Sequence, residues 1–371
     1  MSNNPTKIKS WRALETLSRQ AKKRSIKSLF EDDPKRFENF SAGIDGIFFD
    51  YSKQNINAET LDLLIDIAKS QKLEDKRTAM FAGEKINKSE NRAVLHTALR
   101  RPETDEVLVD GKNIISDIHD VLGKMKDFSD QVRKGEYKGA TGKQIKHIIS
   151  IGIGGSDMGP RLVCHALGSG SSDITVDFVS NIDADDLLTV LKKSDPEKTL
   201  FLVVSKSFKT QDTLVNATTA KEWLSAKLPK AADIGRHFIA ISANEKAAQE
   251  FGLSKENFYP IWNWVNGRFS VWSAVGLPIC LKYGFETFRQ LLDGGYLVDC
   301  HFTEQGLEKN IPVLMALISV WNRNFLDIKA QAILPYSQKL NCLPAYLRQQ
   351  DMESNGKTVN SDGEFISCCR R

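Results

Sequence analysis

Apolar residues recur along this chain in two patterns, and the change from one to the other divides the sequence. Up to about residue 110 they recur at spacings of three and four, as in Trp11, Leu14 and Leu17 and in the segment 61–68. This period predicts amphipathic helices. From about 115 to 285, short unbroken apolar runs alternate with helical patterns, and from 286 to 330 the pattern is helical again. The short runs are residues 148–151, 175–179, 200–204, 238–242 and 259–262.

The short apolar runs predict the strands of a parallel sheet. They lie 20 to 40 residues apart with helical segments between them, which is typical of crossover connections. We therefore predict an α/β fold, with a parallel sheet flanked by helices and a helical region before it. The apolar segment 332–335 is expected to open the first strand of a further unit. Ligands of such sheets bind beyond the carboxyl ends of the strands, so the segments after residues 151 and 204 are the first candidates for a binding site.

The first of these segments, GIGGSD at 152–157, is rich in glycine. A dinucleotide fingerprint would need a third glycine where Asp157 stands, and a P-loop would need lysine where Pro160 stands. Neither signature fits. The Gly155-Ser156 pair can still bring backbone and a hydroxyl close to an anion at a helix N-terminus. The alternative is a tight turn without a ligand.

The second segment combines hydroxyl groups with positive charge at the start of another predicted helix, near Gln211. A helix N-terminus has unsatisfied N–H donors and a partial positive charge, which suit an anion. Taken alone, the segment is also compatible with an ordinary capped helix start. Two such segments in one parallel sheet predict a site for a phosphate monoester. The candidate residues are Ser205, Lys206, Ser207, Phe208, Lys209 and Thr210.

Two further segments carry charged candidates. Arg268 lies in the aromatic stretch WVNGRFSVW, where a guanidinium could stabilise an oxyanion or could instead tie two loops together through their carbonyls. Glu353 lies in QQDMESNGK, which by composition is a polar helix end with a glycine cap. A solvated carboxylate and a general base are both compatible with that position. None of the six histidines lies in these segments.

Composition and charge exclude several classes of protein. The formal net charge is +4, and the short cluster at Lys22-Lys23-Arg24 is typical of a solvated helix face, so no nucleic-acid partner is expected. No run of 18 apolar residues occurs, so no membrane partner is expected. The start of the chain lacks the order of a secretory signal, and the six cysteines show no metal-ligand spacing. We therefore expect a cytoplasmic protein without a metal site.

Four motifs in order, IGIGGSDMGP, SKSFKTQDTL, WVNGRFSVWSAVGLP and MESNGK, give the chain a close resemblance to the glucose-6-phosphate isomerase (phosphoglucose isomerase) family. DDPKRFENFS, DYSKQNI and RAVLHTALR upstream add to it. The resemblance implies two sugar-isomerase (SIS) domains in an intertwined homodimer. On this basis we expect an N-terminal helical region at 1–114 and a first SIS domain at 115–285. Residues 286–371 would hold connecting helices and the truncated start of a second SIS domain.

The resemblance also implies roles for individual residues. Gly155 and Ser156 correspond to the sugar-phosphate loop, and the residues from Ser205 to Thr210 correspond to the phosphate-binding loop. Gln349 corresponds to a substrate-binding glutamine. Arg268 corresponds to the arginine that stabilises the enediolate intermediate, and Glu353 corresponds to the catalytic base. The chain departs from the family pattern at four positions, which are Ser207, Lys209, Asp212 and Asn266.

The reaction implied is interconversion of D-glucose 6-phosphate and D-fructose 6-phosphate by acid/base catalysis, without a metal or nicotinamide cofactor. The family's ring-opening histidine and C-terminal lysine have no counterpart in this sequence. The likeness ends near Phe365, and the tail 366–371 departs from it. We therefore expect a chain truncated at its C-terminus, either an active isomerase or a non-catalytic phosphosugar-binding protein or defective fragment. A regulatory SIS module is disfavoured, because residues 1–110 show no basic recognition helix.

Overall fold

The computed structural model describes residues 4–170, 172–360 and 363–365; the tail 366–371 lies outside the described residues. The chain forms two compact units, each of which draws on segments distant in sequence. Unit 1 consists of Met1–Ala82, Gly294–Ala332 and Lys357–Arg371. Unit 2 consists of Gly83–Asp293 and Ile333–Gly356. The sequence boundaries at 114/115 and 285/286 stay predictions.

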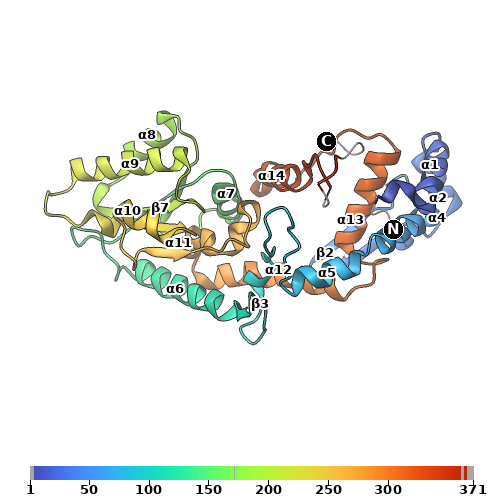
Figure 1. The fold of residues 1–371 in the computed structure, drawn as a ribbon. Helices are drawn as coiled ribbons and strands as arrows, with labels where there is room; N and C mark the ends of the chain where they lie inside the picture. Colours follow the sequence, from blue (N-terminus) through green and yellow to red (C-terminus); the bar gives the residue numbers. More distant parts are fainter. Residues whose placement is uncertain (1–3, 171, 361–362, 366–371) are drawn as a thin grey trace. The chain divides into compact units, whose positions relative to one another are not determined.

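Unit 2 is built on a five-stranded parallel sheet (Figure 1), as the sequence predicts. The strand order is β6-β5-β7-β8-β9. The chain leaves β5 for β6 on one side and later leaves β7 for β8 on the other, so the direction of the connections reverses between β5 and β7. A crevice beyond the carboxyl ends of the strands forms at such a switch point. The strands are β5 His147–Ile151, β6 Thr175–Val179, β7 Thr199–Val204, β8 Phe238–Ser242 and β9 Phe258–Pro260.

The central strands are buried on both faces, which explains their unbroken apolar runs. Successive side chains point to opposite faces: Leu200 and Leu202 join one apolar cluster, whereas Phe201 and Val203 join the other. Residues of α6 and α11 belong to the first cluster, and residues of α8, α9 and α10 belong to the second. These helices are α6 Ile115–Lys134, α8 Ala184–Lys192, α9 Gln211–Lys227, α10 Glu245–Glu250 and α11 Leu277–Tyr283.

The remaining elements of unit 2 lie around the carboxyl ends of the strands. Helix α7, Gly155–Leu167, follows β5 and packs against a 3-10 turn at Gly267–Trp272. Helix α14, Leu343–Asn355, packs against both of them, and its C-cap is Gly356, as the sequence predicts. A short hairpin, β3 Leu108–Val109 and β4 Lys112–Asn113, precedes α6.

Unit 1 is mainly helical around a core that includes Trp11, Leu14, Leu64 and Trp321. It also contains the hairpin β1 Ser41–Ile44 and β2 Ile47–Asp50, which the helical pattern of this region did not predict. The helices are α1 Lys9–Ala21, α2 Ile26–Asp32, α3 Arg36–Asn39, α4 Ala58–Ser70, α5 Leu73–Phe81 and α13 Ile311–Val320, with the last part of α12, Phe285–Glu304.

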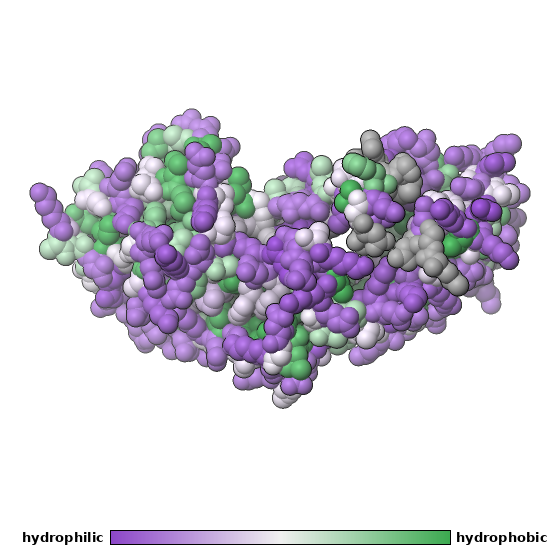
Figure 2. Space-filling model, in the orientation of Figure 1, coloured by the Kyte–Doolittle hydropathy of each residue, from purple (hydrophilic) through white to green (hydrophobic). Residues whose placement is uncertain are grey.

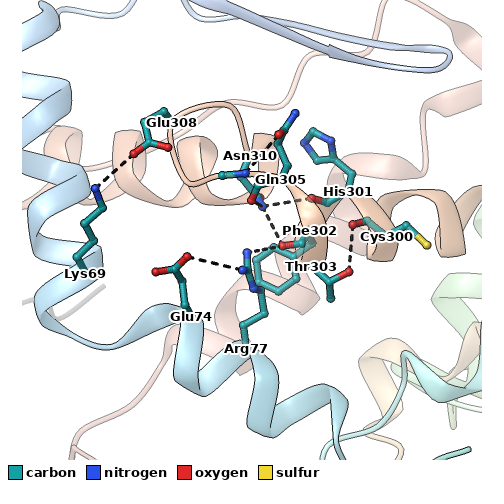
Figure 3. Close-up of polar contacts among 11 residues, drawn as sticks. Lys69, Glu74, Arg77, Cys300, His301, Phe302, Thr303, Gln305, Glu308 and Asn310 are labelled. Carbon is teal, nitrogen blue, oxygen red and sulfur yellow. Dashed lines mark hydrogen bonds and ion pairs between the residues drawn. The ribbon is translucent and has the colours of Figure 1, made fainter.

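Asn310 connects the end of α12 to the start of α13 (Figure 3). Its side-chain amide donates to the carbonyl oxygens of Phe302, at 2.8 Å, and of Gln305, at 3.2 Å. Its side-chain oxygen accepts from Val313 N and so caps α13. Nearby, Arg77 donates to the Phe302 carbonyl. Because Asn310 is fully buried, these bonds satisfy carbonyls that a helix end leaves without partners.

The expected strand at 332–335 is wrong. The structure has no regular element there, and the Leu334 side chain is 72% exposed. A strand needs a neighbour to pair with, and no strand of the sheet lies beside this segment. Within the described residues, the β pairing that follows this segment in the chain is an isolated bridge between Val359 and Phe365.

On the face shown in Figure 2, most residues are hydrophilic and apolar residues form small separate groups. Among the described residues, no helix combines the length and the apolar character that a membrane crossing requires.

Candidate active site

A cavity of about 550 Å³ lies within unit 2, where the loops that follow β5 and β7 meet α14. This is the crevice expected at the switch point of the sheet. The cavity is lined by Arg92, Ile153, Gly154, Gly155, Ser156, Val204, Ser205, Lys206, Ser207, Thr210, Thr213, Asn263, Gly267, Arg268, Gln349 and Glu353. Nine of the eleven candidate residues are in this set, and the two that are not are Phe208 and Lys209.

The first wall is the N-terminus of α7, directly after β5. Gly154 has a φ of 60°, a backbone conformation that favours glycine and turns the chain from strand into helix. A Cβ atom on Gly155 would overlap the backbone of the Gly267–Arg268 turn. Protein packing therefore requires glycine at position 155. Ser156, the second residue of α7, also lines the cavity.

The second wall is the loop between β7 and α9. The hydroxyl groups of Ser205 and Thr210 lie 3.1 Å apart, and Thr210 is the N-cap residue of α9. Phe208 turns this loop, with a φ of 51°, and packs its ring on Phe251 in the core. The buried Phe208 ring thus anchors the loop, whereas the Lys209 side chain is exposed to solvent. These placements explain why neither side chain lines the cavity.

Thr213 adds a hydroxyl that the sequence analysis missed. It lies in the first turn of α9, three residues after Thr210, and only 2% of it is exposed. Its hydroxyl oxygen has no hydrogen-bond partner among the described residues. A buried polar group without a partner is costly, unless a ligand supplies the missing bond. The spacing of three from Thr210 on one helix face is the signal that could have found it.

Positive charge is concentrated on a third wall. The Lys206 ammonium donates to the carbonyl oxygens of Asn263, at 3.0 Å, and Val265, at 2.8 Å. Arg92 donates to the same Asn263 carbonyl and pairs with Glu90. Burial lowers the pKa of Lys206, and the nearby Arg92 guanidinium lowers it further. An anionic ligand beside these two cations would relieve their repulsion.

The fourth wall is α14, which brings the predicted base and arginine together. Glu353 and Gln349 are four residues apart and share one helix face, where Gln349 Nε2 donates to Glu353 Oε1 at 2.7 Å. Arg268 Nη1 lies 3.5 Å from Glu353 Oε2. Arg268 Nε donates to Ser354 Oγ at 2.9 Å. The guanidinium thus bonds to side chains of α14, rather than to the loop carbonyls considered in the alternative interpretation.

Two features of this wall leave room for a ligand. The Glu353 side chain is 47% exposed and borders the cavity. The Gln349 side-chain oxygen is buried and has no partner among the described residues. The Glu353 carboxylate, the Gln349 amide and the Arg268 guanidinium therefore lie together at the cavity, which the residues of the second wall also line.

His96 packs against the turn that carries Arg268. The sequence analysis did not single it out. Its ring stacks on Phe269 with centroids 4.6 Å apart. Burial lowers the pKa of His96 to about 3, with further contributions from Arg100 and Arg268. Its position depends on a contact between segments more than 170 residues apart in sequence, which local pattern does not reveal.

A parallel sheet with this strand order and a polar, cationic cavity at its switch point defines a class of α/β proteins that bind small anionic molecules. Within this class, the phosphoglucose isomerase family model matches residues 50–370. The chain belongs to the phosphoglucose isomerase family, which confirms the resemblance found in the sequence.

The chain is similar to a glucose-6-phosphate isomerase of Methylococcus capsulatus, with 46% identity over 363 residues. The match covers 98% of this chain and 66% of that relative, so the chain spans just under two thirds of its length.

Solved structures agree on the fold. A glucose-6-phosphate isomerase from Chlamydia trachomatis matches with a TM-score of 0.87 and 28% identity, over 98% of this chain and 69% of that one. A hypothetical protein from Thermus thermophilus matches with a TM-score of 0.60 and 23% identity, over 82% of this chain and 64% of that one. The second likeness concerns the fold alone. The α/β, SIS-type fold predicted from the sequence is confirmed.

Proposed function

We propose that this chain binds a hexose 6-phosphate in the unit 2 cavity and interconverts D-glucose 6-phosphate and D-fructose 6-phosphate. The observation that carries the proposal is the arrangement of the cavity, in which a hydroxyl-rich loop at a helix N-terminus faces a carboxylate–guanidinium pair. The name of the relative from Methylococcus capsulatus supports the same activity.

The phosphate group would bind to the second wall. Ser205, Ser207 and Thr210 offer hydroxyl donors there, and the N-terminus of α9 adds backbone N–H groups and a partial positive charge. Lys206 contributes a full positive charge nearby. The sugar chain would then extend towards α7 and α14, where Ser156 and Gln349 can bind its hydroxyl groups.

Glu353 would transfer the proton between the two carbon atoms. Its carboxylate removes the proton from C2 of the open-chain aldose, and the electron pair moves through the new C1–C2 double bond to the carbonyl oxygen. In the resulting cis-enediolate the hydroxyl proton on O2 passes to O1, which moves the negative charge to O2. Glu353 then returns its proton to C1, and the C2–O2 bond becomes the ketone carbonyl. A group within hydrogen-bond reach of the reacting atoms is the first requirement for such a base.

Arg268 would stabilise the intermediate. In the free protein its guanidinium lies beside the Glu353 carboxylate. As Glu353 accepts the proton, the negative charge moves to the enediolate oxygens, so Arg268 stays next to an anion throughout. A donor fixed in place beside developing charge lowers the barrier without reorganisation.

The experiment is an isomerase assay in both directions with Glu353→Gln as the test variant. Asp351→Asn is the matched control, because Asp351 is exposed on the same helix and does not line the cavity. We expect Glu353→Gln to lower kcat by about 100-fold or more, as for loss of a general base, and Asp351→Asn to leave it unchanged. If the unsubstituted chain showed no more turnover than a preparation from cells with an empty vector, the proposed isomerase activity would be refuted.

A homodimer in the cytoplasm follows from the family resemblance and remains part of the proposal. Sedimentation equilibrium of the purified chain would test the dimer.

A further inference from the structure

The segment that carries His96 is tied to the turn that carries Arg268 by several contacts. Leu95 N donates to the Trp264 carbonyl at 3.1 Å. The His96 ring stacks on Phe269 at an interplanar angle of 17°. Arg100, four residues further on, places its guanidinium 4.7 Å from the centre of the Trp272 ring. All of these residues belong to unit 2.

The surroundings of His96 indicate which tautomer it adopts. Its Nδ1 atom lies 3.5 Å from both terminal nitrogens of Arg100. A guanidinium can only donate hydrogen bonds, so this contact favours an unprotonated Nδ1 with the ring proton on Nε2. The ring is therefore neutral. A neutral ring can pack against Phe269 without placing another cation beside Arg268.

Phe269 transmits the position of this ring to Arg268. It is the next residue in the chain, and the Arg268 guanidinium lies 5.2 Å from the centre of the Phe269 ring. Phe269 also interrupts the helical backbone of the turn, with φ −117° and ψ 15°. On the other side, the Arg268 carbonyl accepts from Gln350 and Arg268 Nε donates to Ser354. The guanidinium is thus fixed from α14 and from the Phe269 ring.

We propose that His96 is a positioning residue for Arg268, acting through the stack on Phe269. His96 is not among the residues that line the cavity. The inference rests on the proposed function, because it assigns His96 a part in stabilising the enediolate. A histidine that only fills the core would affect stability, but it would not affect one ligand more than another.

The test compares two ligands that use different walls of the cavity. Inorganic phosphate probes the hydroxyl-rich wall alone. A hydroxamate of a five-carbon sugar acid phosphate adds a planar anionic group that mimics the enediolate beside Arg268. The variants are His96→Ala, which removes the stack, and His96→Phe, which keeps it. His165→Ala is the control, because His165 is exposed on α7. Affinities are measured by calorimetry on variants whose melting curves show a folded protein.

We expect His96→Ala to lower the affinity for the hydroxamate by about 10-fold or more, as for a displaced catalytic group. The same variant should lower the affinity for phosphate by less than about 3-fold. His96→Phe should keep the hydroxamate affinity within about 3-fold of the original. Equal losses for both ligands, or a loss with Phe as large as with Ala, would overturn the proposal.

A second measurement needs no ligand. Arg268 Nε–H donates to Ser354 Oγ, so its ¹⁵N-detected exchange with solvent should be slow in the original chain and in His96→Phe. It should be faster in His96→Ala, and unchanged exchange there would overturn the positioning role. If the unsubstituted chain fails to bind the hydroxamate, the proposed function fails, while the exchange data still decide the role of His96.

Discussion

A Cβ atom on Gly155 would lie 2.6 Å from the amide nitrogen of Arg268, closer than such atoms approach in folded proteins. The N-terminus of α7 and the turn of Arg268 therefore pack backbone against backbone. This contact fixes the distance between the first wall of the cavity and the turn that carries the guanidinium. Glycine is the residue type that allows it, because any side chain would fill the space.

Gly155→Ala should therefore separate the two segments. We expect the free energy of unfolding to fall by about 1–3 kcal/mol, as for overpacking, and hexose phosphate affinity to fall by about 10-fold or more. Chemical denaturation and calorimetry measure the two effects. Gly123→Ala in α6 is the control, since a Cβ atom there meets nothing within 4 Å. The free energy of unfolding of this control variant should rise by up to about 1 kcal/mol, because alanine has a higher helix propensity than glycine. A Gly155→Ala protein with unchanged stability and affinity would refute the close packing.

Thr213→Val should stabilise the free protein and lower its affinity for the ligand. The substitution removes a buried hydroxyl that has no partner among the described residues and keeps its shape. We expect unfolding free energy to rise by about 0.5–1 kcal/mol and phosphate affinity to fall by about 5-fold, the worth of one hydrogen bond. Thr213→Ser should retain the affinity. Thr218→Val, at an exposed position of α9, should change neither quantity. A loss of stability in Thr213→Val would show that the hydroxyl already has a partner in the free protein.

The pH dependence of stability should reveal two neutral histidines in unit 2, the buried His237 and the partly buried His96. His237 Nδ1 lies 2.7 Å from the Thr199 carbonyl, and its Nε2 accepts from Ala140 N at 2.9 Å. This arrangement needs a neutral ring, and burial lowers the pKa of His237. Burial also lowers the pKa of His96, to about 3.

Both shifts have the same sign. The unfolded chain binds protons near the ordinary histidine pKa of about 6.5, whereas the folded chain does not. Stability is therefore fully present above pH 6.5 and is lost as the pH falls towards the folded values. For His96, whose folded pKa is about 3, the loss should approach about 1.4 kcal/mol per pH unit near pH 5, and His237 adds a loss of the same sign. His96→Phe should reduce the slope of unfolding free energy against pH. An unchanged slope would contradict a neutral His96.

Arg36 should be essential for the fold of unit 1. It is 1% exposed, and its guanidinium donates to the carbonyls of Ser52, Gln54 and Ile56. Lysine cannot reproduce this fork of donors. Arg36→Lys should therefore lower the unfolding free energy by about 3 kcal/mol or more, because carbonyls lose their partners. Arg12→Lys, an exposed change on α1, is the control. Equal stability of the two variants would contradict a structural role for the Arg36 guanidinium.

The sheet could be predicted from sequence because its strands are buried on both faces. Residues 175–179 and 238–242 form strands with the expected bounds, and the α9 helix begins at Gln211 as expected. A short apolar run also led us to predict a strand at 332–335, but this segment has no strand to pair with. The hairpin at 108–113 was missed although Asp110-Gly111 is a turn signal. Both residues adopt positive φ there, as a two-residue hairpin requires.

The candidate site was predictable where its residues follow strands of the sheet, as Ser156 and Thr210 do. The Arg268–Glu353 ion pair joins segments 85 residues apart, and only the family resemblance linked them. His96 and Arg92 reach the site region from a segment without a strand or a phosphate motif, so local pattern gave no signal for them. Phe208 shows the opposite error, because its loop was identified correctly while its side chain packs into the core.

A crystal structure of the chain with D-fructose 6-phosphate tests the central claim most directly. The account predicts electron density for the sugar in the unit 2 cavity, with the phosphate beside Ser205, Ser207 and Thr210 and the C1–C2 end beside Glu353 and Arg268. Density for the sugar at another place on the chain, or an empty cavity at saturating ligand, would contradict it.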